Sequence, residues 1–260
     1  MQIPSGGIFF FDSGIGGLTV LSACRKATPN IPFYYYGDNL NAPYGNKPLA
    51  EIKRLVFNAF KQAETLSPVC AVVACNTATA VCSEELRQKY SFPIIGVEPA
   101  IFPAVKSTKN VGVLSTKATY ESVRFSRLLN HARALYPTAK ITPFACCNLA
   151  GEIEKNVLNL EYDYTPLLPP INADAIVLGC THYVYIKEQI RRFYSAPVFD
   201  GNEGVASRLK SIILDKIRDG QPLATPSLND LKNAQIYFLG QSNGYNKHIY
   251  EQMFVKTNSF

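Results

Sequence analysis

Short apolar runs alternate with longer amphipathic stretches along most of the chain. Each run has the length and bounding turn residues of a buried strand, and each longer stretch repeats apolar residues every three or four positions, as one helix face does. In the first half we expect strands at 7–11, 32–37, 70–74 and 93–97, and helices at 17–26, 48–66 and 79–89. In the second half we expect strands at 110–114, 140–145, 174–178, 196–199 and 235–239, and helices at 119–134, 151–160, 181–193, 202–218 and 244–254.

This alternation is typical of parallel sheets in an α/β fold. Because the strands are apolar throughout, we expect helices on both faces of each sheet, in a three-layer, Rossmann-like arrangement. The pattern begins again after residue 97, so we predict two similar domains. The tail after about residue 207 could complete either one; we assign it to the first, which gives domains at 1–97 plus 208–260 and at 98–207.

Two segments of the chain resemble each other. Residues 69–79 read VCAVVACNTAT and residues 173–183 read ADAIVLGCTHY, so that each has an apolar strand followed by a small residue, a cysteine and polar residues. Cys75 and Cys180 are 105 positions apart (180 − 75), as are Gly14 and Thr119 (119 − 14) in two other strand-end loops. We therefore predict duplicated halves related by pseudo-twofold symmetry, with the active site in the cleft between them.

The positions of these two cysteines favour a chemical role. In open α/β sheets, ligands bind beyond the carboxyl ends of the strands, where Cys75 and Cys180 are expected to lie. A helix that begins just after a thiol lowers the thiol pKa, and its free N–H groups can hold a carboxylate. By contrast, Cys24, Cys70 and Cys82 fall in apolar stripes and are expected to be packing residues, whereas the Cys146–Cys147 pair is left open.

Composition narrows the class of protein. The seven cysteines are odd in number and irregularly spaced without a CxxC pair, which disfavours a disulfide framework and a zinc ribbon and predicts reduced thiols in the cytoplasm. A 47% hydrophobic and 18% charged chain can bury a core, and we expect neither a membrane span nor a secretory signal. The net charge of +6 comes from scattered residues, which favours an ordinary solvated surface over a surface that attracts small anionic substrates, and we expect no nucleic acid.

The glycine-rich segment FDSGIGGLTV allows two interpretations. It resembles a dinucleotide-binding loop, with Asp38 in the place of the ribose-binding acid, but Thr19 stands where a third glycine is needed. Asp12 also precedes the glycines directly, where it would repel a pyrophosphate. We therefore favour a small zwitterion, whose carboxylate would meet helix N–H groups while Asp12 binds an ammonium or orients a thiol. A nicotinamide-dependent oxidoreductase stays as an alternative.

Six motifs together carry a resemblance to a known family. In chain order they are FDSGIGGLTV, YYYGDNLNAPYGNK, VVACNTATA, IIGVEPA, VGVLSTKAT and VLGCTHY, and they resemble the glutamate racemases of the aspartate/glutamate racemase superfamily over about residues 8–209. The resemblance implies an isomerase that interconverts L- and D-glutamate without pyridoxal phosphate, metal or other cofactor. Its product would serve peptidoglycan synthesis, and hence cell wall biogenesis and cell shape. It also implies a cytoplasmic enzyme, and we expect a homodimer.

The same resemblance implies roles for particular residues. Cys75 and Cys180 would be the two acid/base groups, with Asp12 assisting the first and His182 the second. A further acid would be Glu154, although Glu152 competes for that place. The implied substrate-binding residues are Asp12, Ser13, Pro43, Tyr44, Gly45, Asn76, Thr77, Thr116, Thr119, Thr181 and His182.

Two thiols on opposite faces of a substrate suit racemisation, because one removes the Cα proton while the other delivers a proton to the opposite face. The sequence leaves open whether glutamate, aspartate or another acidic amino acid is the substrate. A protein that only binds an amino acid, or one that inhibits another enzyme, is a non-enzymatic alternative, but simple binding needs no paired cysteines.

Overall fold

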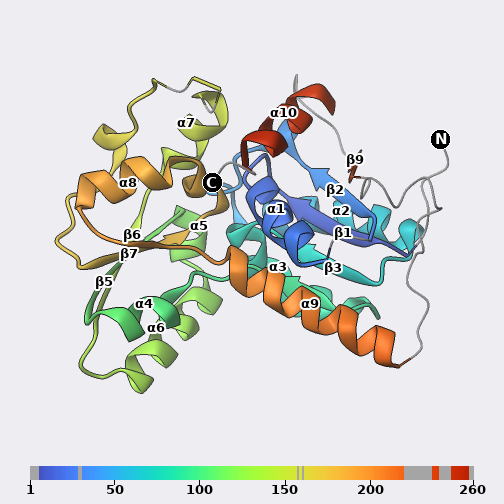
Figure 1. Cartoon of the computed structure of the whole chain (residues 1–260), viewed down its shortest axis with the longest axis horizontal. Coiled ribbons are helices and arrows are strands. Elements are labelled where there is room, and N and C mark those ends of the chain that lie inside the picture. Colours follow the sequence, from blue (N-terminus) through green and yellow to red (C-terminus); the bar gives the residue numbers. More distant parts are fainter. Residues whose placement is uncertain are drawn as a thin grey trace.

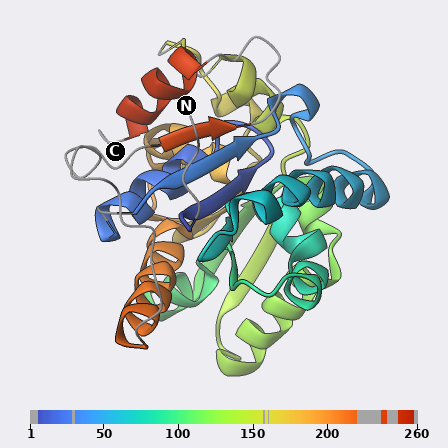
Figure 2. The same ribbon diagram turned by 90° about the vertical axis from the view of Figure 1, so that its right-hand side faces the viewer.

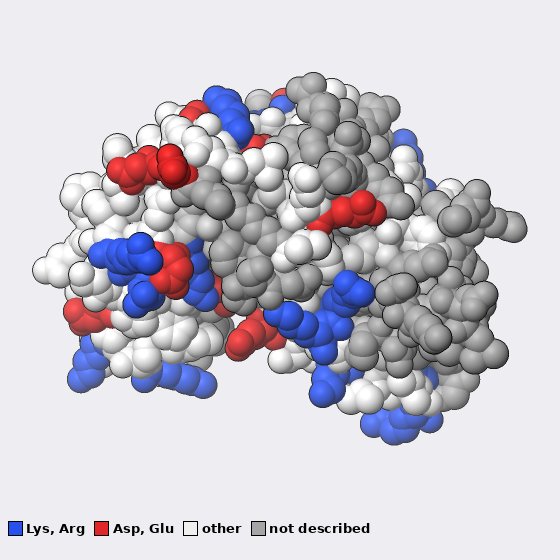
Figure 3. All heavy atoms as spheres, turned by 45° about the horizontal axis from the view of Figure 1, so that its top comes forward, with Lys and Arg blue, Asp and Glu red and all other residues white. Residues whose placement is uncertain are grey.

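The chain is built around two parallel β-sheets (Figure 1). The computed structural model describes residues 6–28, 31–156, 158, 159, 161–219, 236–239 and 247–257. Among these residues, no helix is both long and apolar enough to cross a membrane. On the face drawn in Figure 3, Lys and Arg side chains are interspersed with Asp and Glu rather than gathered in one stripe.

The first sheet has five strands in the order β4-β3-β1-β2-β9, and every neighbouring pair is parallel. Its last strand comes from the tail of the chain: β9 pairs with β2 so that Tyr237 lies opposite Tyr34, as Figure 2 shows for the two strands. The strands are β1 (Ile8–Asp12), β2 (Phe33–Gly37), β3 (Cys70–Val73), β4 (Ile94–Gly96) and β9 (Ile236–Leu239).

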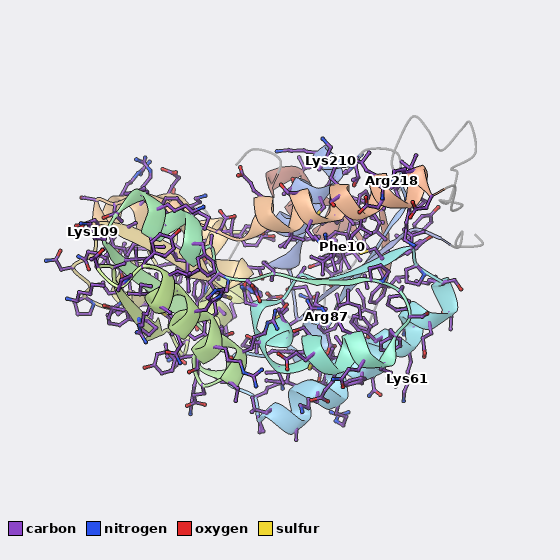
Figure 4. All side chains as sticks on the ribbon, turned by 90° about the horizontal axis from the view of Figure 1, so that it is seen from below. Phe10, Lys61, Arg87, Lys109, Lys210 and Arg218 are labelled. Atoms are coloured by element: carbon purple, nitrogen blue, oxygen red, sulfur yellow. The ribbon has the colours of Figure 1, made fainter. Side chains whose placement is uncertain are left out.

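Helices cover both faces of this sheet because successive strand residues point to opposite sides. Phe9 and Phe11 pack in one apolar cluster with α2 and α3, whereas Ile8 and Phe10 pack in another with α1, α9 and α10. In Figure 4, Phe10 lies between the layers, and Lys210 and Arg218 point away from α9. The elements are α1 (Gly17–Ala27), η1 (Asn39–Asn41, a 3₁₀ turn), α2 (Leu49–Leu66), α3 (Asn76–Lys89), α9 (Asn202–Arg218) and α10 (Lys247–Thr257).

The second sheet has four parallel strands in the order β6-β5-β7-β8. Its strands are β5 (Asn110–Ser115), β6 (Lys140–Ala145), β7 (Ala175–Gly179) and β8 (Val198–Phe199). The other elements of this half are α4 (Ile101–Ser107), α5 (Lys117–Tyr120), α6 (Val123–Leu135), α7 (Leu149–Asn156), η2 (Thr165–Leu167), η3 (Thr181–Ile186) and α8 (Lys187–Tyr194).

The two sheets repeat one strand order. Numbered within each half, the first four strands of the first sheet run 4-3-1-2, and β8-β7-β5-β6 has the same sequence. Cys75 follows the third strand of the first half and Cys180 follows the third strand of the second. The α/β class with two parallel sheets is therefore confirmed, and the sequence echo falls on equivalent strands.

Local differences from the predicted elements occur mainly at helix ends. Helix α3 begins at Asn76 rather than at 79, because the Cys75 sulfur caps its first turn. The helix expected at 181–193 is instead a 3₁₀ segment followed by α8, and the segment joining the halves contains α4, a helix that the sequence pattern does not predict. Three predicted elements extend into residues that the structure does not describe, namely 157, 160, 235 and 244–246. Most of the predicted loop at 219–229 also lies outside the described residues.

Candidate active site

Cys75 lies at the carboxyl end of β3 and caps helix α3. Its sulfur accepts a hydrogen bond from the Ala78 amide at 3.4 Å and lies 3.4 Å from the Ser13 hydroxyl. Burial, followed by the negative charge of Asp12, raises the pKa of Cys75 to about 12, although these two hydrogen bonds oppose the shift. Cys75 therefore rests as a thiol.

Cys180 occupies the equivalent place at the carboxyl end of β7. Its sulfur lies 3.8 Å from Nδ1 of His182, whose Nε2 is 2.5 Å from a carboxylate oxygen of Glu154. Burial by itself lowers the pKa of His182, but Glu154 and Cys180 reverse that effect and raise the pKa well above its ordinary value. An imidazolium is therefore available beside the Cys180 sulfur.

The structure separates the two competing glutamates. Glu154 is buried and contacts His182, and its carboxylate also accepts a hydrogen bond from the Ile15 amide at 3.4 Å. A Cβ atom on Gly14 would stand 2.6 Å from this carboxylate, so only glycine leaves room for it. Glu152, by contrast, pairs with Lys155 at the surface of α7. Of the two, it is Glu154 that reaches the Cys180 side of the site.

Asp12 ends the central strand β1 and is fully buried. One carboxylate oxygen accepts a hydrogen bond from the Gly14 amide at 2.8 Å, and the other lies 3.5 Å from the Thr181 hydroxyl. Burial raises the pKa of Asp12, and the nearby His182 opposes that shift. Ser13 is thus the direct side-chain neighbour of the Cys75 sulfur, whereas Asp12 affects Cys75 through its charge.

Three threonine hydroxyls form a cluster that joins the two halves. Thr77 Oγ1, at the start of α3, lies 2.9 Å from Thr116 Oγ1 and 3.2 Å from Thr119 Oγ1, both of which follow β5. Thr116 and Thr119 are 3.0 Å apart. Beside this cluster, the buried Asn76 amide nitrogen has no hydrogen-bond partner among the described residues. These polar groups sit where two helix N-termini meet, which is suitable for binding a carboxylate.

The predicted turn at Pro43, Tyr44 and Gly45 borders the same cluster. The Tyr44 hydroxyl donates to Asp38 at 2.5 Å, and the Gly45 carbonyl accepts from the Ala118 amide at 2.8 Å. Pro43 faces Gly151, where a Cβ atom would lie 3.5 Å from the proline ring. Asp38 therefore anchors this turn through Tyr44. This hydrogen bond engages the carboxylate that a dinucleotide site would use to bind the ribose.

The remaining cysteines differ from this pair. Cys24, Cys70 and Cys82 are buried, and burial raises the pKa of each, to about 12 for Cys70 and Cys82. They pack in the apolar clusters that hold the first sheet between its helices. Cys146 is also buried, whereas Cys147 is exposed and provides a natural comparison for the candidate active thiols.

Sequence reasoning missed two residues next to the site. Asn39 in η1 contacts Glu154, and Tyr250 in α10 contacts Asn39. Asn39 follows a strand end beside Asp38, and that position could have singled it out. Tyr250 lies more than 200 positions further along the chain, and only the fold brings it there.

Comparisons with known proteins point to one family. The family model for Asp/Glu/hydantoin racemases matches residues 20–209. The glutamate racemase of Clostridium botulinum is 38% identical over 221 residues, which are 81% of this chain and 84% of that protein.

Solved structures agree with this match. The glutamate racemase RacE1 of Bacillus anthracis has a TM-score of 0.76 at 26% identity and covers 98% of this chain and 94% of its own. The glutamate racemase of Escherichia coli, solved with L-glutamate and the activator UDP-MurNAc-ala, has a TM-score of 0.80 at 25% identity and covers 98% of this chain and 96% of its own. With a fold shared over almost its whole length and a family match over most of it, this chain belongs to the Asp/Glu/hydantoin racemase family.

Proposed function

We propose that this protein is a glutamate racemase that uses Cys75 and Cys180 as its two acid/base groups. The observation that carries the proposal is the pair of thiols at the carboxyl ends of equivalent strands, β3 and β7, each with its own polar partner. The relatives named glutamate racemase and the Escherichia coli complex with L-glutamate support glutamate as the substrate.

In this proposal the two thiols start the reaction in different protonation states, and this difference allows turnover. Cys180, next to the His182 imidazolium, acts as a thiolate and removes the Cα proton from the enantiomer that presents it. Cys75, held as a thiol, gives its proton to the opposite face of the planar carbanion. Cys180 then holds the proton as a thiol and Cys75 is the thiolate, so the opposite enantiomer reacts by the same steps in reverse.

The Cα proton of an amino acid is weakly acidic, so the site must stabilise the developing negative charge. We assign this role to the donors that converge on the substrate carboxylate: the Asn76 amide, the Thr77 and Thr181 hydroxyls and the amides at the starts of α3 and η3. Asp12 would bind the ammonium group. Ser13, Pro43, Tyr44, Gly45, Thr116 and Thr119 complete the binding surface in our proposal, and the burial of most of these side chains helps to exclude water.

We also make proposals for the domains of the chain, its oligomeric state and its location in the cell. We propose domains at 1–97 plus 208–260 and at 98–207, related by pseudo-twofold symmetry, with the substrate in the cleft between them. The pairing of β9 with β2 and the packing of α9 against α1 support the assignment of the tail to the first domain. We further propose a cytoplasmic homodimer that supplies D-glutamate for peptidoglycan.

The test is the loss of optical activity from pure D-glutamate, followed by circular dichroism, with D-aspartate in a parallel arm. We expect racemisation of glutamate, and we expect Cys75→Ser and Cys180→Ser each to lower the rate by about 10²–10⁴-fold, the usual contribution of a general acid or base. The matched control is Cys147→Ser, an exposed thiol that should keep the wild-type rate. Faster turnover of aspartate would reassign the substrate, and a near-normal rate in either active-thiol variant would remove that residue from the mechanism.

A further inference from the structure

A chain of buried polar contacts leads from the C-terminal helix to Cys180. The Tyr250 hydroxyl donates to Oδ1 of Asn39, and Nδ2 of Asn39 donates to one oxygen of Glu154 at 2.5 Å. The other oxygen of Glu154 meets Nε2 of His182, whose Nδ1 faces the Cys180 sulfur. Five side chains from α10, η1, α7, η3 and the end of β7 thus form one continuous path.

Resting on the proposed function, we infer that Tyr250 and Asn39 are positioning residues that hold Glu154 against His182 and so keep the His182 ring facing the Cys180 sulfur.

The order of donors and acceptors along this path has only one consistent direction when Glu154 is ionised. A carboxylate only accepts hydrogen bonds, so the Asn39 amide must turn its NH₂ group toward Glu154 and its carbonyl toward Tyr250, whose hydroxyl then donates. For the same reason Nε2 of His182 must carry the proton that faces Glu154. Nδ1 is left facing Cys180, where it can exchange a proton with the thiol.

Two glycines make room for this path. A Cβ on Gly37, at the end of β2, would stand 2.9 Å from Asn39 Oδ1 and would also overlap the Tyr250 hydroxyl. A Cβ on Gly14, at the end of β1, would displace the Glu154 carboxylate. The glycines at the ends of β1 and β2 therefore leave the space that the side chains of this path occupy.

The ring of Tyr250 is held firmly enough to position a hydroxyl. It stacks on Phe238 of β9 with ring centroids 5.1 Å apart and an interplanar angle of 4°, and it meets Tyr35 of β2 edge-on at 5.7 Å. Both Tyr250 and Asn39 are buried. A hydrogen bond in such buried surroundings is stronger than in water, and successive hydrogen bonds in a chain strengthen one another. The tail of the chain is thereby connected to the chemistry of the second half.

The experiment measures His182 directly and does not depend on turnover. The chain has three histidines, so ¹⁵N-imidazole NMR with a His182→Gln spectrum for assignment gives the tautomer and protonation midpoint of His182. The other titratable groups that face the path are Asp12 from β1, Tyr35 from β2, Cys75 before α3, Cys146 after β6 and Tyr183 in η3.

Tyr250→Phe removes one hydroxyl and keeps the stacked ring. We expect the His182 midpoint to fall by about one pH unit and kcat for glutamate to fall about tenfold, the size of one buried hydrogen bond, with KM changing less than about threefold. The control is Tyr194→Phe, which removes a tyrosine hydrogen bond to the Pro169 carbonyl, 2.6 Å away in the second half, and should change neither quantity.

Asn39→Asp is a second, independent variant with nearly the same shape. At low pH the introduced carboxyl group shares a proton with Glu154 and can replace the amide donor, so His182 should behave as in the wild type. As the pH rises and that proton is lost, two carboxylates repel each other, and both the His182 signal and kcat should depart from the wild type. A merely structural defect would lower the melting temperature without this pH signature.

The outcomes separate the two proposals. If both variants keep the wild-type His182 tautomer and protonation midpoint, the positioning role of Tyr250 and Asn39 is overturned, whatever the activity. If the His182 midpoint shifts as expected but the protein does not racemise glutamate, the positioning role is supported and the proposed function is overturned instead.

Discussion

At the scale of single residues, the same thiol group is placed in two different environments, one at Cys75 and one at Cys180. Cys75 is buried beside a hydroxyl and near the charge of Asp12, which favours the thiol, whereas Cys180 is next to a histidine whose pKa is raised. Two thiols with different neighbours can serve one reaction as its acid and its base. The distinction between the two cysteines lies in their neighbours, since the side chains are identical.

The role of Glu154 can be tested against a nearby glutamate on the same helix. Glu154→Gln removes the negative charge that opposes the burial cost of the His182 imidazolium, so we expect the rate of racemisation to fall by about 10²-fold. Glu152→Gln alters only surface contacts and should keep the wild-type rate. Steady-state kinetics of the two variants checks this, and equal losses in both would contradict the assignment.

The raised pKa of His182 also predicts how stability depends on pH. A histidine whose pKa is higher in the folded state than its unfolded value of about 6.5 binds its proton more tightly when folded. Its stabilising contribution is therefore complete below about pH 6.5 and is lost as the pH rises through the folded-state pKa. We expect the difference in free energy of unfolding between wild type and Glu154→Gln to shrink over that range in urea titrations. A difference that stays constant with pH would show that the pair does not titrate as described.

At the scale of elements, the site is assembled from strand ends and the helices that follow them. The carboxyl ends of β1, β3, β5 and β7 carry Asp12, Cys75, Thr116 and Cys180, and parallel pairing places the ends of each sheet along one edge. Each polar group therefore needs only to follow its strand directly. This explains why a short apolar run followed by a cysteine was informative.

The threonine cluster between α3 and α5 should matter for both binding and stability. Thr77→Val keeps the shape of the side chain but removes hydrogen bonds to Thr116 and Thr119, so we expect a loss of about 1 kcal/mol in unfolding free energy. Since the Thr77 hydroxyl is also one of the donors proposed to stabilise the developing negative charge, kcat should fall more than KM rises. Thr65→Val, at an exposed threonine on α2, is the control for both urea unfolding and kinetics. An unchanged kcat would remove Thr77 from the proposed donors.

At the scale of the whole molecule, the halves supply opposite members of one site. Cys75 follows a strand of the first sheet and Cys180 follows a strand of the second, and buried contacts cross between the halves where Thr181 meets Asp12 and where Glu154 accepts from the Ile15 amide. The tail crosses back to the first sheet as β9 and α10, so both ends of the chain support the same half.

Two thiols from separate halves predict a specific isotope pattern. In deuterated water, the thiol that delivers a proton exchanges with solvent, while the other thiol receives the proton from the substrate. Early in the reaction the product should therefore carry deuterium at Cα while the unreacted substrate keeps its hydrogen, as NMR or mass spectrometry can measure. A fully protonated product would contradict a mechanism with two separate bases.

The local pattern of the chain was sufficient to predict its α/β class, each of the nine strands in the part that the structure describes, and the places of Cys75 and Cys180 after equivalent strands. Strand and helix periodicities depend on neighbours a few positions apart, and Cys75 and Cys180 follow their strands directly, so this information is local. The start of α3 was misplaced because a sulfur cap is not a usual helix signal.

Only the tertiary structure decided which glutamate meets His182 and which distant residues support it. Glu152 and Glu154 differ by two positions on one helix, and the packing of that helix turns Glu154 toward His182 and leaves Glu152 at the surface. Asn39 and Tyr250 are separated by 211 positions and meet because β9 pairs with β2 and α10 packs against α1. Contacts of this kind depend on how whole elements pack, and packing is set by the complete chain rather than by any segment of it.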